Sequence, residues 1–259
     1  MSDAGTPHDR IGAAIRAAGA GGRTALVAFL TGGFPDRRQF REGLAAVADL
    51  ADVVEIGVPF TDPMADGVTI QRASHAALAA GFTLPWLLDE LAAIRPRSPA
   101  PLLLMSYLNP LLAFGFDALA SRAAEVGVGG FIVPDLPYEE SAPFKAALEP
   151  HALALVQMVT PATPPERLKR LCAASQGFVY AVTRTGVTGD VALPPETAAY
   201  LAAVKAASGL PVCAGFGVRR AEQVALIGAH ADGVIVGSAL VEVLERGADP
   251  AAFLKSLHG

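Results

Sequence analysis

About eight short apolar segments recur along the chain, and a stretch with helical spacing of apolar residues follows each one. The segments cover residues 24–30, 52–57, 101–107, 130–134, 153–159, 177–182, 211–215 and 233–237. They are nearly continuous hydrophobic runs, a pattern typical of parallel strands that are covered on both faces. The regular alternation predicts a closed (β/α)8 barrel, preceded by an extra N-terminal helix over residues 8–19.

The main alternative is an open, doubly wound sheet. An open sheet that binds a dinucleotide carries a glycine fingerprint directly after its first strand. Here the first strand is followed by the sequence TGGFP at 31–35, and its proline does not fit that fingerprint. Because the chain has 259 residues and no linker or low-complexity segment, we expect one barrel domain over residues 1–259.

Composition excludes several classes of function. The net charge is −5 and no basic cluster is present, which argues against a nucleic-acid partner. No apolar run reaches the roughly 18 residues of a membrane span, and the N-terminus lacks the apolar core of a signal peptide, so we expect a cytoplasmic protein without a membrane partner. Cys172 and Cys213 have no His or Cys at ligand spacing. We therefore expect no metal site and two buried, reduced cysteines.

Glu55 lies inside the second apolar segment, where a carboxylate is unfavourable unless it is paired or used. Side chains alternate along a strand, so Val53, Glu55 and Gly57 share one face. A glutamate that faces the barrel interior near its mouth would meet a substrate. Partial burial would raise its pKa, which suits a group that gives and takes a proton near neutral pH. The alternative is a structural glutamate paired with an arginine such as Arg184.

Two aspartates follow this strand in a turn-rich segment. Asp62 lies between Thr61 and Pro63, so we expect its side chain to hydrogen-bond the local backbone and form a turn. Asp66 precedes Gly67 and a helix. The pattern leaves open whether Asp66 caps that helix or contacts a ligand.

Two glycine-rich turns follow the last two predicted strands, at 214–218 and 236–239, with Ser238 expected at a helix N-cap. Exposed backbone N–H groups at the start of a helix favour an anion. The loops after the last two strands of a (β/α)8 barrel are a recurrent phosphate site. The sequence therefore predicts a phosphorylated ligand, although the glycines could also serve only to form tight turns.

The sixth predicted strand and its loop add two candidates. The loop at 183–190 is rich in Gly and Thr and could act as a lid that excludes water, with Gly189 close to the phosphate. Within the strand, Tyr180 shares a face with Phe178 and Val182. Its hydroxyl could lie near the site, or the ring could be part of the core.

Several of these motifs resemble those of the tryptophan synthase alpha chain family. The resembling segments are 55–67, 135–141, 183–189, 215–217 and 237–239. The resemblance extends from about residue 24 to the C-terminus. It implies a (β/α)8 barrel that cleaves indole-3-glycerol phosphate to indole and D-glyceraldehyde 3-phosphate, a lyase step of tryptophan biosynthesis.

The resemblance also implies roles for individual residues. Glu55 would protonate C3 of the indole and later help remove the glycerol hydroxyl proton. Asp66 would accept the indole N–H and stabilise the indolenine cation. The implied substrate-binding residues are Phe29, Tyr180, Thr188, Gly189, Phe216, Gly217, Gly237 and Ser238. Thr61 stands where some members have serine, and Tyr107 is given no role.

The family works with a partner, a beta chain that contains pyridoxal phosphate and receives the indole. The resemblance therefore implies a heterotetramer of two alpha and two beta chains. Nothing in this sequence resembles a pyridoxal-phosphate site, so we expect no cofactor in this chain. An apolar segment around 108–116, expected to be an exposed loop, is the candidate contact surface.

Two other functions remain as alternatives. Another phosphate-binding barrel enzyme, such as a sugar-phosphate isomerase, would share the two glycine turns but would not need the Glu55 and Asp66 pair. A non-catalytic barrel that only activates a partner enzyme would be expected to lack both carboxylates, and both are present.

Overall fold

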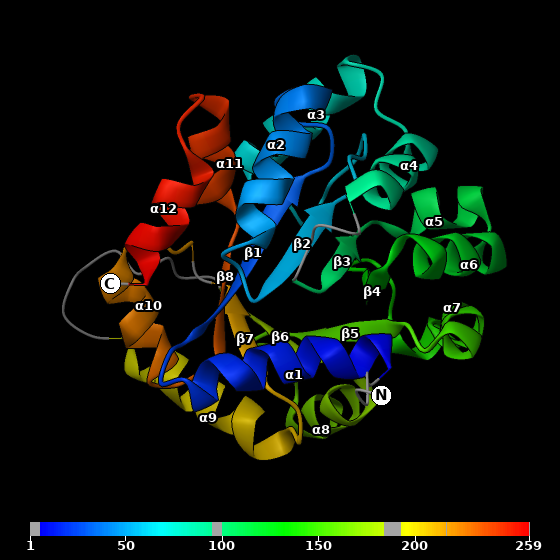
Figure 1. The fold of residues 1–259 in the computed structure, drawn as a ribbon. Coiled ribbons are helices and arrows are strands. Elements are labelled where there is room, and N and C mark those ends of the chain that lie inside the picture. Colours follow the sequence, from blue (N-terminus) through cyan, green and yellow to red (C-terminus); the bar gives the residue numbers. More distant parts are fainter. Residues whose placement is uncertain (1–5, 95–99, 184–192, 216, 259) are drawn as a thin grey trace, which may run out of the picture.

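The computed structural model describes residues 6–94, 100–183, 193–215 and 217–258, and its strands form a closed parallel barrel inside a ring of helices (Figure 1). The strands pair in chain order, and β1 closes the barrel by pairing with β8. The strands are β1 (Ala25–Thr31), β2 (Val53–Gly57), β3 (Leu102–Met105), β4 (Val128–Ile132), β5 (Ala154–Val159), β6 (Val179–Val182), β7 (Val212–Gly215) and β8 (Gly233–Val236). The predicted (β/α)8 architecture is confirmed.

The helices follow the strands as the periodicity predicts, with some additions. They are α1 (Pro7–Ala20), α2 (Arg37–Ala48), α3 (Val68–Ala79), α4 (Leu84–Ile94), α5 (Leu108–Phe114), α6 (Phe116–Val126), α7 (Ala142–Leu148), α8 (Pro165–Ala174), α9 (Pro195–Ala207), α10 (Ala221–Gly228), α11 (Ser238–Glu245) and α12 (Pro250–Leu257). Two short 3-10 turns, η2 (Tyr138–Glu140) and η3 (Glu149–His151), flank α7.

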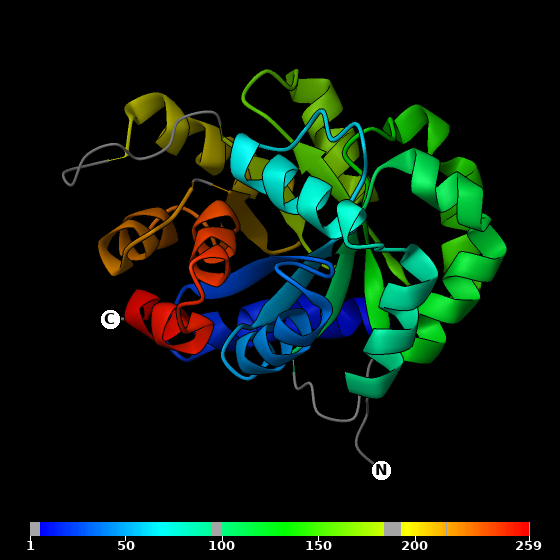
Figure 2. The same ribbon diagram turned by 90° about the horizontal axis from the view of Figure 1, so that it is seen from above.

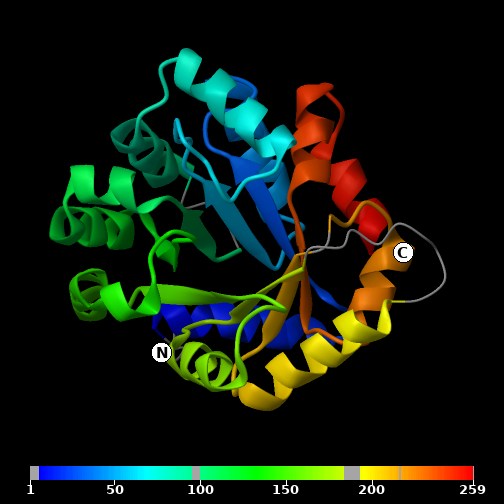
Figure 3. The same ribbon diagram turned by 180° about the vertical axis from the view of Figure 1, so that it is seen from behind.

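The predicted extra helix, α1, covers one end of the barrel. It lies across the strands in Figure 1 and behind them in the reverse view of Figure 3. A view turned by 90° places α1 (blue) and α3 (cyan) on opposite sides of the strands (Figure 2). The helix starts with a capping box between Thr6 and Asp9. Its buried side chains Ile11 and Ile15 pack into the barrel interior.

The strand side chains divide into an inner and an outer core, as alternation along a strand requires. On β2, Val53 belongs to the inner cluster together with Val27 of β1. Val54 and Ile56 belong to the outer cluster, which packs against the helices. This division confirms that Glu55, which lies between Val54 and Ile56, faces the barrel interior.

The predicted exposed loop at 108–116 is wrong, because most of it forms helix α5. The Asp135 carboxylate accepts a hydrogen bond from the Leu108 N–H at 2.8 Å, which satisfies one donor of the first turn. Pro110 also lies in that turn, where the missing N–H costs no helical hydrogen bond. Gly115, at φ 89°, then separates α5 from α6. Leu111 is buried, and Leu112 remains 53% exposed.

In the part of the chain that the structure describes, no single helix has the length and hydropathy needed to cross a membrane. Residues 68–79 and 84–93, bent by 92° at their junction, meet those two criteria only as a pair.

Replacing Ile11 with alanine tests the role of α1 as the cover of the barrel end. The change leaves a cavity against the inner core, so we expect the free energy of unfolding to fall by about 2 to 5 kcal/mol. Urea unfolding measures it, with exposed Arg10→Ala on the same helix as the control, expected to stay within about 0.5 kcal/mol of the parent. Equal stability of Ile11→Ala and the parent would show that α1 does not contribute to the core.

Candidate active site

Glu55 lies in the barrel interior, paired in register with Phe29 on β1 and Leu103 on β3. Its side chain is fully buried, and neither carboxyl oxygen has a hydrogen-bond partner among the described residues. Burial, with a smaller contribution from the negative charge of Asp66, raises the pKa of Glu55 to about 8. The alternative partner, Arg184, lies outside the residues that the structure describes.

Asp66 lies in the loop between β2 and α3. The N-cap residue of α3 is Gly67, and no side chain caps this helix, so the interpretation of Asp66 as the N-cap is wrong. Burial raises the pKa of Asp66 to about 6, and a hydrogen bond from the Tyr107 hydroxyl opposes this rise. The Asp66 carboxyl group is therefore directed at neighbouring side chains and the interior.

Tyr107 is a site residue that the sequence did not reveal. Its hydroxyl accepts a hydrogen bond from the Ala65 N–H at 2.9 Å and donates one to the Asp66 carboxylate. The ring stacks on Phe60 at 5.3 Å between centroids, and the side chain is buried. Tyr107 lies two residues after the end of β3, so the rule that functional residues lie after barrel strands could have indicated it.

A cavity of about 280 Å³ opens where these residues meet. Of the predicted site residues, its lining includes Phe29, Glu55, Asp66, Tyr180, Gly217, Gly237 and Ser238. The lining residues that were not predicted are Ala65, Gly67, Ile70, Met105, Met158, Val182, Thr183, Gly215 and Ile235. The predicted residues Thr188, Gly189 and Phe216 lie outside the described part of the chain.

A larger cavity of about 540 Å³ lies at the other end of the barrel, beside α1 and the segments that enter β1, β7 and β8. Two cations at this cavity are neutralised by partners, because Arg23 pairs with Asp52 and Lys205 pairs with Asp232. Its location at the N-terminal ends of the strands is where barrels keep stabilising residues rather than catalytic ones.

The cavity around Glu55 and Asp66 has an apolar and aromatic wall. A Cβ atom at Gly57 would lie 2.4 Å from the ring of Phe29, so the glycine leaves the space that this ring needs. The hydroxyl of Tyr180 would lie 3.4 Å from a Cβ atom at Gly215. Burial, with a further contribution from Glu55, raises the pKa of Tyr180 well above its ordinary value, so this phenol stays neutral.

The loop after β7 and the start of α11 also line this cavity. Gly217 has a positive φ of 66°, which favours glycine, and nothing lies within 4 Å of the position that a Cβ would take. The N-cap of α11 is Gly237, so the prediction of Ser238 at that position is wrong by one residue. No side chain caps α11, and its first N–H groups suit an anion.

Asp62 behaves differently from Asp66, although both come from the loop after β2. Its carboxylate accepts a hydrogen bond from the Thr61 hydroxyl at 2.6 Å, and the Met64 N–H donates to its main-chain oxygen at 2.9 Å. Asp62 is exposed and does not line the cavity. The expected hydrogen bond from the local backbone to this carboxylate is wrong, because its donor among the described residues is the Thr61 hydroxyl.

The two carboxyl groups of the cavity differ in pKa, about 8 for Glu55 and about 6 for Asp66. At a pH between about 6 and about 8, Glu55 is therefore protonated and Asp66 is ionised. One fold thus holds an acid and an anion side by side, an arrangement that enzymes use to protonate one atom of a substrate and stabilise a positive charge at another. Among the described residues, no group of three or more His, Cys, Asp or Glu could hold a metal ion.

The chain matches the family model described as "Tryptophan synthase alpha chain" over residues 15–256. The tryptophan synthase alpha chain of Nitratidesulfovibrio vulgaris strain Hildenborough is 44% identical over 244 residues, covering 93% of this chain and 95% of that protein. That of Geobacter sulfurreducens is 42% identical over 244 residues, covering 91% and 92%.

Solved structures agree with these relatives. A Mycobacterium tuberculosis tryptophan synthase structure in space group F222 has a chain that is 39% identical, with a TM-score of 0.89 and 96% of each chain covered. The tryptophan synthase subunit alpha of Legionella pneumophila strain Paris is 34% identical, with a TM-score of 0.86 and 96% and 97% covered.

The buried state of Glu55 predicts a pH-dependent stability. Glu55 titrates near 4.5 in the unfolded chain and near 8 in the fold, so between these pH values only the folded state keeps the proton. The stability that this proton provides is complete below about pH 4.5 and is lost as the pH rises through 8. Glutamine does not titrate, so Glu55→Gln should gain stability relative to the parent between pH 5 and 8.

Urea unfolding of the parent and Glu55→Gln at several pH values measures this difference, and Glu42→Gln on the exposed face of α2 is the control. A Glu55→Gln variant that is less stable by the same amount at every pH, or that does not fold, would indicate an ionised, paired, structural Glu55.

Tyr107→Phe tests the contact with Asp66. Without the phenol, the Asp66 carboxylate loses a donor that favours its charged form, so its pKa should rise above about 6. A ¹³C NMR titration of carboxyl groups measures the change, and Tyr138→Phe, which removes a hydroxyl outside the cavity, is the control. An unchanged or lower Asp66 pKa in Tyr107→Phe would contradict the contact.

Proposed function

The chain belongs to the tryptophan synthase alpha chain family, and from that premise we propose that the cavity around Glu55 and Asp66 is where it carries out the alpha reaction. The chain is the alpha subunit, a carbon–carbon lyase of tryptophan biosynthesis that cleaves indole-3-glycerol phosphate to indole and D-glyceraldehyde 3-phosphate. One observation carries the assignment of the site: Glu55 is fully buried without a hydrogen-bond partner among the described residues. It lies beside a second carboxyl group in a cavity that is also lined by Gly217 and Gly237.

Protonated Glu55 starts the reaction by giving its proton to C3 of the indole ring, which turns the indole into an indolenine cation. Asp66 accepts a hydrogen bond from the indole N–H and stabilises the positive charge on that nitrogen. A carboxylate that faces a developing cation in a site without water contributes several kcal/mol. The raised pKa of Glu55 makes the proton available near neutral pH.

The second step returns the proton to Glu55. The Glu55 carboxylate takes the proton of the glycerol hydroxyl next to the ring. The carbon that carries this hydroxyl, which is bonded to C3 of the indole, becomes the aldehyde of glyceraldehyde 3-phosphate. The bond between this carbon and C3 breaks, and its electron pair restores the neutral indole. Glu55 therefore ends the cycle as it began, and the balance needs no oxidant or reductant.

The other cavity residues fit the two ends of the substrate. We assign the indole ring to the wall with Phe29 and Tyr180, and the phosphate to Gly217, Gly237 and Ser238. The start of α11 supports the second assignment because its first turn has no side-chain cap. Thr188, Gly189 and Phe216 stay assigned to the substrate by family resemblance alone.

Membership of the family implies a beta-chain partner. We propose a heterotetramer of two alpha and two beta chains in the cytoplasm, with pyridoxal phosphate bound only by the beta chain. Exposed apolar side chains at the mouth of the barrel support a contact there: Met64 and Val68 flank the Asp66 loop with exposed fractions of 81% and 76%, and Leu112 lies on α5. Met64 and Val68, together with the segment 108–116 that contains Leu112, form the candidate contact surface.

The competing functions fit the cavity less well. A sugar-phosphate isomerase has no need of the aromatic wall formed by Phe29 and Tyr180, and a non-catalytic barrel has no need of a buried acid. Indole release from indole-3-glycerol phosphate by the purified chain, alone and with a beta chain, separates the lyase from the other two functions. The lyase assignment is wrong if no indole appears in either case.

Substitution of the two carboxylates ranks their roles. Glu55→Gln removes the acid–base group, so we expect the rate of indole release to fall by about 10³-fold or more while glycerol phosphate still binds. Asp66→Asn keeps a hydrogen-bond acceptor but loses the charge, so the loss should be smaller, about 10²-fold. The assay is steady-state indole release.

Asp62→Asn, from the same loop but outside the cavity, is the matched control and should change the rate by less than about twofold. An Asp66→Asn loss as large as that of Glu55→Gln would mean that the two roles are ranked wrongly.

A further inference from the structure

The phosphate end of the cavity is assigned to two segments that lie beyond the paired parts of β7 and β8. The loop after β7 carries Gly217, and helix α11 begins at Ser238 after β8. The pairing of β7 with β8 ends at Gly215 and Ile235. Gly215 is the last residue of β7, and β8 continues to Val236. Contacts outside the sheet therefore set the distance between the loop and the helix, and the buried Val218 side chain of the loop is one of them.

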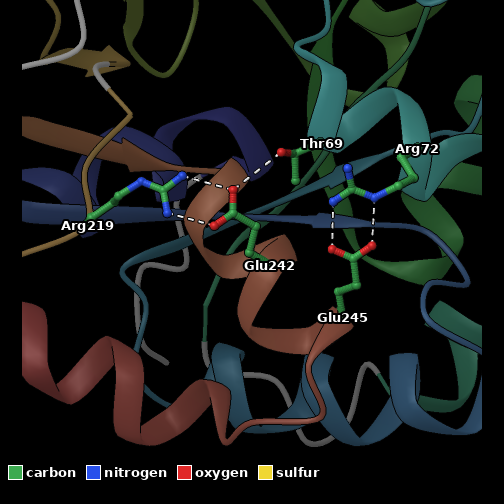
Figure 4. Close-up of polar contacts among 5 residues, drawn as sticks. All are labelled: Thr69, Arg72, Arg219, Glu242 and Glu245. Atoms are coloured by element: carbon green, nitrogen blue, oxygen red, sulfur yellow. Dashed lines mark hydrogen bonds and ion pairs between the residues drawn. The ribbon is translucent and has the colours of Figure 1, made fainter.

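Glu242, one turn into α11, provides such a contact (Figure 4). The guanidinium of Arg219, two residues after Gly217, donates to both oxygens of the Glu242 carboxylate, at 2.7 and 2.9 Å. This two-point geometry fixes orientation as well as distance. Arg219 also holds the pKa of Glu242 below its ordinary value, so the pair stays charged at neutral pH.

The same carboxylate reaches a third segment. The Thr69 hydroxyl donates to Oε1 of Glu242 at 3.4 Å, and Thr69 lies in the first turn of α3, three residues after Asp66. One side chain on α11 thus contacts the loop after β7 and the helix that follows the Asp66 loop. The Glu242 side chain is 23% exposed, so much of it is shielded from solvent.

A second ion pair, between α3 and α11, serves as a natural comparison (Figure 4). Arg72 of α3 donates to both oxygens of Glu245 on α11, at 2.7 and 2.6 Å. Arg72 and Glu245 each lie three residues after Thr69 and Glu242. Among the described residues, the hydrogen bonds of the Glu245 side chain join only α3 to α11, whereas those of Glu242 also include the loop after β7.

We propose that Glu242 is a positioning residue for the known reaction, which holds the Gly217 loop at the distance from the start of α11 at which N–H groups of both segments meet one phosphate group. This inference rests on the phosphate assignment made above. A loop that is already in place does not have to be ordered when the substrate binds, so the ordering cost does not reduce affinity. Glu242 acts through the loop and does not touch the substrate.

The test measures the dissociation constant of glycerol 3-phosphate by calorimetry for the parent, Glu242→Ala, Arg219→Ala, the double variant and the control Glu245→Ala. Exposed or half-exposed ion pairs are worth up to about 1 kcal/mol, so each single variant should bind about threefold to fivefold more weakly. The double variant should be no weaker than either single one, because both remove the same contact. Glu245→Ala should stay within about twofold.

Kinetics separate positioning from a general loss of structure. The lost contact affects substrate and transition state equally, so KM for indole-3-glycerol phosphate should rise by the same factor while kcat stays unchanged. Thermal unfolding of Glu242→Ala and Glu245→Ala should shift by similar amounts, since each loses one ion pair of α11.

The outcomes distinguish this inference from the function on which it rests. A parent that does not bind glycerol 3-phosphate would overturn the phosphate assignment and this inference together. Parent binding with unchanged affinity in Glu242→Ala and Arg219→Ala would overturn the positioning role alone. Equal weakening by Glu245→Ala would assign the effect to the packing of α3 on α11. Tighter binding of glycerol 3-phosphate by Glu242→Ala would make Arg219 a phosphate ligand.

Arg219 is 54% exposed, so Arg219→Ala carries the test if Glu242→Ala does not fold.

Discussion

The free-energy cost of burying Glu55 is the constraint on which the site depends. A fully buried carboxyl group without a hydrogen-bond partner among the described residues is unfavourable as an anion, so it holds its proton up to about pH 8. The same burial makes Glu55 a proton donor at the pH at which an ordinary glutamate has already lost its proton. The fold accepts this cost inside a barrel whose interior is otherwise filled by apolar side chains.

The other groups of the site are held by contacts that are less buried than Glu55. Tyr107 holds Asp66 from the loop after β3, and Asp66 remains ionised beside a protonated Glu55 at neutral pH. Further out, Glu242 connects the two glycine turns and the helix that follows Asp66. The proton chemistry proposed for Glu55 thus lies in the barrel interior, and the groups assigned to the phosphate lie where charged contacts join the loops.

The sequence was sufficient to predict the barrel and the direction in which Glu55 points, because both follow from the strand period and from continuous apolar runs. The position of Tyr107 after β3 could have marked it as a candidate, but its contact with Asp66 could not be predicted, since that contact depends on how far the loops after β2 and β3 reach toward each other. Helix α5 was missed because Asn109 and Pro110 are typical of a loop, and its first donor is satisfied by Asp135, which is distant in sequence. The N-cap of α11 differs by one residue because Gly237 and Ser238 both suit that position.

A direct measurement of the Glu55 pKa is the sharpest test of this account. Carboxyl groups labelled with ¹³C can be titrated by NMR in the intact chain, with Glu55→Gln used to assign the signal. The account predicts an apparent pKa of about 8, well above the ordinary value of 4.5. A Glu55 that titrates near 4.5 would be an ionised group, and the proposed acid in the barrel interior would not exist.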